Sequence, residues 1–165
     1  MTLISGMIAL SENEPSPPPA DWARQLLGFW FDGHDRTDWY GGGADFDSAV
    51  ADLAADWHDA LRSQPASSFL TDPDTALAAA ILFDQVPRNI HRHNAEAFAT
   101  DDLARAIARG IVAHGWDRDW PDERRQFAYL PFQHSEDMAD QRESLRLFNQ
   151  LADPLFHDYA HKHFD

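Results

Sequence analysis

The chain has 165 residues, of which 44% are apolar, and it includes 11 Phe and 6 Trp. A domain of about 150 residues buries roughly 70% of its unfolded surface, so this composition predicts one folded core and excludes disorder of the whole chain. Lys and Arg number 13 against 28 Asp and Glu, a net charge of −15. Such a charge repels phosphate backbones and anionic lipids, so we expect no nucleic-acid partner and no membrane partner. The absence of cysteine excludes disulfides, thiolate metal ligands and thiol nucleophiles.

Residues 1–18 contain a proline-rich stretch that disfavours both a helix and burial, so we expect a flexible N-terminal tail. Residues 19–165 are expected to form a single helical domain. The longest purely apolar run, Ala76–Phe83, is far shorter than the ~18 residues that a membrane span needs. The sequence therefore predicts a soluble protein.

Apolar residues recur at spacings of three and four from Pro19 onward, which is typical of amphipathic helices. The first helix is expected over 19–31. Glycines then indicate a loop over 33–43 that carries Trp39 and Tyr40. Asp45 is a candidate N-cap for a second helix that ends near Leu61.

Asp72 and Pro73 have the pattern of an N-cap followed by a first-turn proline, and they predict a third helix that reaches about Val86. Because this segment is apolar on nearly every face, we expect it at the centre of the fold. A fourth helix is expected to start at Thr100–Asp102 and to end at Gly115.

Pro121 predicts the start of a short fifth helix, and a sixth helix is expected over 135–151. Asp153 and Pro154 predict the start of a seventh helix that runs to the end of the chain. Strand patterns are nearly absent. The predicted fold class is therefore all-α, with about seven helices in antiparallel pairs, either tetratricopeptide-like or an irregular bundle.

Polar residues close the central helix, and they form the first candidate site: Asp84, Gln85, Arg88 and Asn89. If the helix persists past Pro87, the side chains of Asp84 and Arg88 share one face. A guanidinium fixed by a carboxylate can clamp an anionic ligand, while the two amides orient it. The alternative is that these residues only complete a helix end.

His134 and Glu136 form a second candidate, with His134 as a general base that either Glu136 or Asp84 orients. Ser135, Glu136 and Asp137 also fit the start of a helix.

A third cluster contains His157 and His161, which share a helix face and would need a third ligand such as His134 to hold a metal. We expect no metal and no cofactor.

Several segments resemble a bacterial family of unknown function, DUF924; they are Gly28–Phe31 with Trp39, Ala79–Ile90, Ala97–Asp101, Phe127–Asp137 with Gln141, and Tyr159–His161. The resemblance implies a helical, tetratricopeptide-like fold in a cytoplasmic bacterial protein, and it implies no activity. Members of that family continue beyond the position of His161 with a stretch rich in Arg. The resemblance therefore predicts that this chain lacks the C-terminal segment of the family.

We interpret Asp84, Gln85, Arg88, Asn89, His134 and Glu136 as one polar pocket that binds an anionic small molecule. Hydrolysis is an extension of this hypothesis, with His134 and Glu136 transferring the proton. The alternative is a scaffold of paired helices that binds a peptide or protein without catalysis. A third hypothesis is a metal-dependent hydrolase that uses His134, His157 and His161.

Overall fold

The most apolar stretch of the sequence forms the central helix of the fold. The computed structural model describes residues 17–154, and all regular structure within that range is helical. α5 (Pro73–Asp84) buries every side chain from Ala76 to Asp84 and contacts α2 (Trp22–Leu27), α7 (Asp101–His114) and α8 (Asp122–Gln133). The predicted all-α class is confirmed. The tetratricopeptide-like arrangement stays a prediction.

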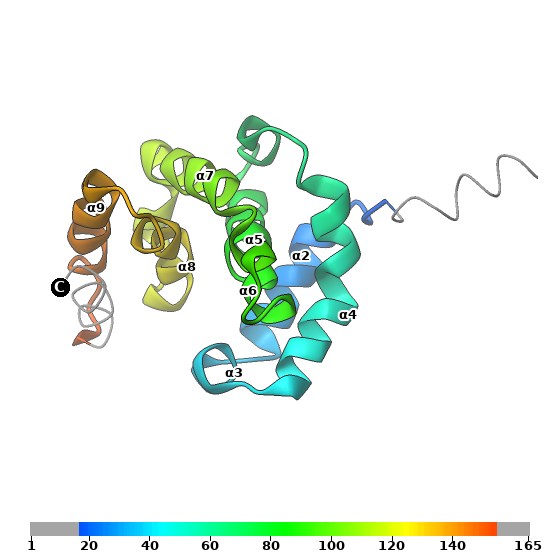
Figure 1. The fold of residues 1–165 in the computed structure, drawn as a ribbon. Helices are drawn as coiled ribbons and strands as arrows, with labels where there is room; N and C mark the ends of the chain where they lie inside the picture. Colours follow the sequence, from blue (N-terminus) through cyan, green and yellow to red (C-terminus); the bar gives the residue numbers. More distant parts are fainter. Residues whose placement is uncertain (1–16, 155–165) are drawn as a thin grey trace, which may run out of the picture.

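The other helices surround α5, and α4 and α9 lie at opposite ends of the molecule in Figure 1. They are α3 (Arg36–Gly41), α4 (Ala44–Leu61), α6 (Val86–Ile90) and α9 (Met138–Phe148), with 3₁₀ turns at Ala66–Phe69, Ala95–Phe98 and Trp116–Asp119. α4 contacts α6, and α8 contacts α9. The predicted tail up to residue 16 and the predicted last helix from residue 155 lie outside the described residues.

The N-terminal part departs from prediction in two places. After α2 the chain forms a π-helix, Gly28–Asp32, in which the Trp30 carbonyl accepts a hydrogen bond from the Trp39 indole N–H (3.0 Å). The predicted loop is wrong over Arg36–Gly41, because Asp35 and Asp38 form a capping box that starts α3. The aromatic residues of that region are thereby fixed on a helix.

Several helix ends follow the prediction. The Asp72 carboxylate accepts from the Thr75 N–H (2.9 Å) at the start of α5, and Gly115 ends α7 in the left-handed conformation with φ of 71°. α4 starts at Ala44, so Asp45 lies in its first turn rather than at its N-cap. α8 is a full helix of 12 residues, longer than the short helix predicted from Pro121.

Pro87 kinks the chain between α5 and α6 and frees two carbonyl groups. Proline has no N–H, so the Phe83 carbonyl loses its helical donor and accepts instead from the Thr100 hydroxyl (2.7 Å). The Asp84 carbonyl accepts from Nη1 of Arg88 (2.6 Å). The kink thereby ties the start of α7 to the end of α5, beside the candidate site.

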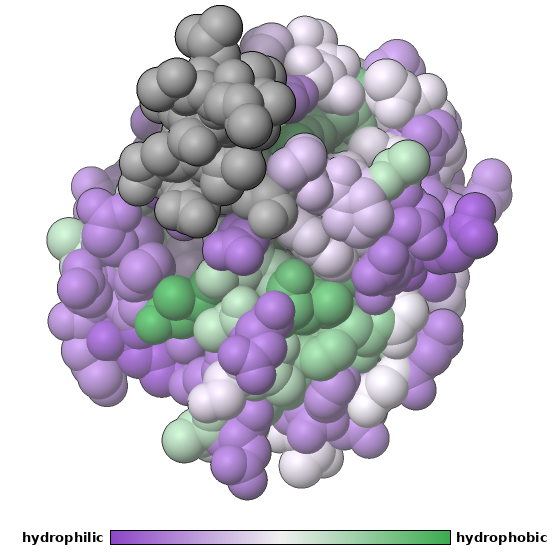
Figure 2. Space-filling view, turned by 90° about the vertical axis from the view of Figure 1, so that its right-hand side faces the viewer, coloured by the Kyte–Doolittle hydropathy of each residue, from purple (hydrophilic) through white to green (hydrophobic). Residues whose placement is uncertain are grey.

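The face on which α4 lies is mostly hydrophilic, with a group of hydrophobic residues at its centre (Figure 2). A helix that crosses a membrane must be both long and apolar. None of the helices in the described range meets that condition.

Candidate functional site

A buried carboxylate and a histidine form the base of the site. Asp84, the last residue of α5, has a side chain only 2% exposed, and its Oδ1 lies 2.8 Å from Nδ1 of His134. His134 is the C-cap of α8, where the helix ends against α5. An ionised carboxylate only accepts hydrogen bonds, so Nδ1 of His134 carries the proton in this pair. The predicted orientation of His134 by a carboxylate is therefore present, with Asp84 in that role.

The ionised form of Asp84 is stabilised by its neighbours. Burial alone would raise the pKa of Asp84, but His134, Arg88 and Gln85 together hold this pKa below its ordinary value. Nε2 of Gln85 donates to Oδ2 of Asp84 (2.8 Å). The carboxylate is thus used entirely within the protein, and it positions His134 rather than facing a ligand.

Arg88 is held by the first turn of α7. Its two Nη atoms donate to the two carboxylate oxygens of Asp101 at 2.7 and 3.0 Å, and its guanidinium lies over the ring of Phe98, 5.2 Å from the centroid. This bidentate pair fixes the guanidinium plane. The guanidinium that was predicted to clamp an anionic ligand therefore binds Asp101. Nη2 of Arg88 uses only one of its two hydrogens within the described part of the chain.

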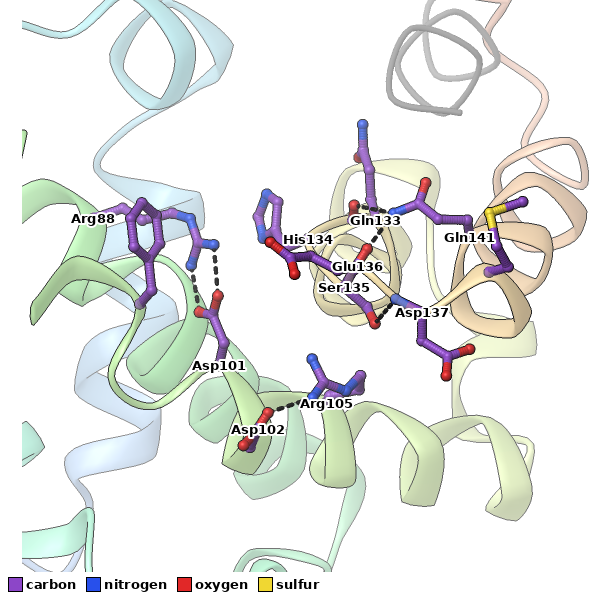
Figure 3. Close-up of a pocket in the computed structure, with 12 residues that line it drawn as sticks. Arg88, Asp101, Asp102, Arg105, Gln133, His134, Ser135, Glu136, Asp137 and Gln141 are labelled. Atoms are coloured by element: carbon purple, nitrogen blue, oxygen red, sulfur yellow. Dashed lines mark hydrogen bonds and ion pairs between the residues drawn. The ribbon is translucent and has the colours of Figure 1, made fainter. Parts of the chain in front are cut away.

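A cavity of about 1080 Å³ opens between the start of α7 and the turn that joins α8 to α9. Figure 3 shows Arg88 and Asp101 on one side of this space and Asp137 and Gln141 on the other, with His134 and Glu136 between them. The lining residues are Arg88, Phe98, Asp101, Asp102, Arg105, Gln133, His134, Ser135, Glu136, Asp137, Met138 and Gln141. The cavity therefore brings Arg88 of the first predicted cluster together with His134 and Glu136 of the second.

The six predicted site residues divide into three groups. Arg88, His134 and Glu136 line the cavity, whereas Asp84 and Gln85 lie behind His134 and do not. Asn89 is not brought to the cavity, because its amide donates to Asp47 of α4 (2.9 Å). Arg92 binds the same carboxylate, so Asn89 and Arg92 together attach α6 and the segment that follows it to α4.

The turn before α9 also forms the helix start that the sequence predicted at this position. The Ser135 hydroxyl accepts from the Asp137 N–H (3.1 Å) and donates to Asp140 (2.7 Å), and the Asp137 carboxylate caps α9. Gln141 donates to the carbonyls of Gln133 and Ser135. These bonds attach the turn to the end of α8 and to the start of α9.

Sequence reasoning missed Asp101 and Arg105 as members of the site. Both lie on α7, where Arg105 pairs with Asp102 and approaches Asp140 (3.5 Å). The signal was present, since Asp101 and Arg105 are four residues apart and share one face of a helix. The pairing of Asp101 with Arg88 depends on how α5 and α7 pack, and local sequence does not define it.

The predicted pair of His157 and His161 stays a prediction, because both residues lie outside the described residues. Within residues 17–154, no group of three or more His, Asp or Glu side chains has an arrangement that could hold a metal ion.

The sequence matches the family described as "Bacterial protein of unknown function (DUF924)" over residues 26–165. The chain belongs to the DUF924 family. The resemblance drawn from sequence segments is thereby confirmed, and all six predicted site residues fall inside the matched range.

The DUF924 chain is also similar to a solved structure, described as "Structure of Protein of Unknown Function ATU0120 from Agrobacterium tumefaciens". The two are 34% identical, the TM-score is 0.83, and the match covers 88% of this chain and 82% of the other. No curated protein matches the sequence. Neither the family nor this neighbour is described with an activity, so the function must be argued from the site.

Proposed function

We propose that this DUF924 protein binds a small molecule in the cavity through an anionic group placed against Arg88 and Arg105. The observation that carries the proposal is that both guanidiniums line one cavity and each keeps donor capacity. Nη2 of Arg88 makes a single bond, and Nη1 of Arg105 makes none within the described residues. A carboxylate or phosphate oxygen is the natural acceptor for such N–H groups.

The supporting electrostatics are local. Asp101 and Asp84 hold the guanidinium of Arg88, and Asp102 and Asp140 hold that of Arg105, so neither arginine must be reoriented when a ligand arrives. Both arginine side chains are about four-fifths buried, which strengthens a hydrogen bond from them relative to one in bulk water. The net acidity of the chain does not attract an anion from a distance, so recognition must come from these short-range donors.

The pair of Asp84 and His134 favours hydrolysis as a second candidate function. A buried carboxylate that fixes the tautomer and orientation of an imidazole is one part of general base catalysis. Under this proposal His134 takes the proton from a nucleophile, and Asp84 positions the ring. Glu136 is the second proton carrier named from the sequence, and it lies beside His134 in the cavity.

Binding is tested by calorimetric titration of the protein with acetate, benzoate and inorganic phosphate. At least one of these anions is expected to bind, and Arg105→Gln is expected to weaken that binding about tenfold, the loss of one charge-assisted hydrogen bond. Arg146→Gln on α9 is the matched control, because Arg146 pairs with Glu143 outside the cavity. No heat of binding with any of the anions, or equal affinity for Arg105→Gln and the control, would contradict the proposal.

Hydrolysis needs a separate test. Turnover of p-nitrophenyl acetate and p-nitrophenyl phosphate is compared for the unmodified protein and His134→Gln, which keeps a polar side chain at the cavity wall. A rate above that of the buffer that disappears in His134→Gln supports catalysis. No rate above that of the buffer, or a rate that the substitution leaves unchanged, would contradict a catalytic role of His134. The cytoplasmic location predicted from the resemblance also stays a proposal.

A further inference from the structure

The charges of the cavity wall are not balanced within the protein. Two guanidiniums and four carboxylates line it. Three of these carboxylates are used: Asp101 holds Arg88, Asp102 holds Arg105, and Asp137 caps α9. Glu136 makes no hydrogen bond or ion pair with any other residue in the described range, and Figure 3 shows its side chain directed into the space beside His134. Glu136 is exposed, so water solvates its carboxylate in the free protein, and a ligand with a positive charge beside Glu136 would gain an ion pair there.

The size of the cavity also indicates a ligand larger than a simple anion. Ligand pockets of about 300–1000 Å³ hold organic molecules of drug size. At about 1080 Å³, this cavity has room for much more than an acetate or phosphate ion. A ligand that fills it must contact the wall beyond the two arginines.

Apolar side chains border the polar wall. Phe98 is 60% exposed and Met138 is 54% exposed, and they are two of the three large apolar side chains in the described structure that are exposed. Both line this cavity. Exposed large apolar residues gathered at one cavity indicate contact with an apolar group of a ligand.

From these three observations we infer that the ligand is a zwitterion with an apolar side group. Its anionic group lies against Arg88 and Arg105, its cationic group against Glu136, and its apolar group against Phe98 or Met138. The inference rests on the proposed function, because it assigns the same two arginines to the anionic group.

The experiment uses leucyl-alanine and two derivatives that each remove one charge. N-acetylation removes the cation of the dipeptide, and C-terminal amidation removes its anion. Each compound is titrated by calorimetry into the full chain and into Glu136→Gln. The free dipeptide is expected to bind the unmodified protein, and Glu136→Gln is expected to weaken this binding about fivefold, the effect of one partly solvated ion pair. The acetylated dipeptide is expected to bind both proteins equally.

Glu143→Gln is the matched control, since it makes the same charge change on α9 outside the cavity, and it is expected to leave the affinity unchanged. The inference is overturned if leucyl-alanine does not bind, or if acetylation or Glu136→Gln has no effect. If benzoate or phosphate still binds in an Arg105-dependent manner, the proposed function survives that result. If amidation also has no effect and no simple anion binds, both fail.

Discussion

His58 is a buried histidine whose hydrogen-bonding role is defined by its neighbours. The Thr100 hydroxyl donates its hydrogen to the Phe83 carbonyl, so it can only accept from Nε2 of His58 at 3.0 Å. Nε2 of His58 therefore carries a proton. Burial, reinforced by the nearby charge of Arg62, lowers the pKa of His58 to about 4.

This shift predicts a loss of stability in mild acid. In the unfolded chain the histidine takes up a proton near pH 6.5, whereas in the folded protein it stays neutral down to about pH 4. Its contribution to the free energy of unfolding is complete above about pH 6.5 and is lost as the pH falls toward about 4, a change of about 3 kcal/mol. Asp84 adds to the loss only at lower pH, because its pKa lies below the ordinary carboxyl value.

Urea denaturation at about pH 7 and about pH 4.5 measures this loss. His58→Gln, which keeps a donor for Thr100 and has no titrating ring, is expected to reduce the difference between the two conditions by about 2 kcal/mol or more. His114→Gln is the control, because His114 is exposed and stacks on Trp116. An equal acid loss in both variants would show that other groups cause it.

At the scale of elements, the kink at Pro87 connects the core to the candidate site. The hydroxyl of Thr100 replaces the hydrogen bond that proline cannot make, and the next residue, Asp101, holds Arg88. The first turn of α7 is thus fixed against α5 by one buried neutral hydrogen bond and against α6 by one ion pair. Substitution at Thr100 should therefore affect both stability and the position of Arg88.

Thr100→Val keeps the shape of the side chain and removes its hydroxyl. We expect a loss of about 2–3 kcal/mol in the free energy of unfolding, because the buried Phe83 carbonyl and the buried N–H of His58 both lose their partner. Thr71→Val, at an exposed hydroxyl that bonds only to Asp72, is expected to cost less than about 0.5 kcal/mol. Equilibrium urea unfolding compares the two. A loss at Thr100 as small as that at Thr71 would refute this role.

The elements also show what could be predicted from sequence. The start of α5 and the end of α7 depend on local chemistry, the Asp72 cap and the left-handed Gly115, and both predictions were correct. α3 was missed because neighbouring glycines outweighed its capping box.

The candidate site was predicted only in part, because its contacts depend on helix packing. The contact of His134 with Asp84 follows from the packing of α8 on α5. The hydrogen bond from Asn89 to Asp47, which keeps Asn89 away from the cavity, follows from the packing of α6 on α4. Neither contact is encoded in a local pattern.

At the scale of the whole molecule, the net charge of −15 opposes folding, because it brings like charges together in a compact state. The arginines reduce this repulsion only locally. Arg36, for example, binds both Glu123 of α8 and Asp153 and so links α3 to the C-terminal side of the fold. Most of the other ion pairs involve an exposed partner, and such pairs contribute little each.

Added salt is therefore expected to stabilise the protein. Raising NaCl from about 20 to about 200 mM shortens the Debye length to below 10 Å and screens the repulsion, which should raise the Tm by about 3 °C. Asp52→Asn combined with Asp56→Asn removes two exposed charges of α4 that make no ion pair within the described residues, and it should reduce this salt response. Differential scanning calorimetry of both proteins measures the effect. A Tm that falls with salt would mean that the ion pairs of Arg36, Arg88 and Arg105 outweigh the net repulsion, since screening weakens attraction and repulsion alike.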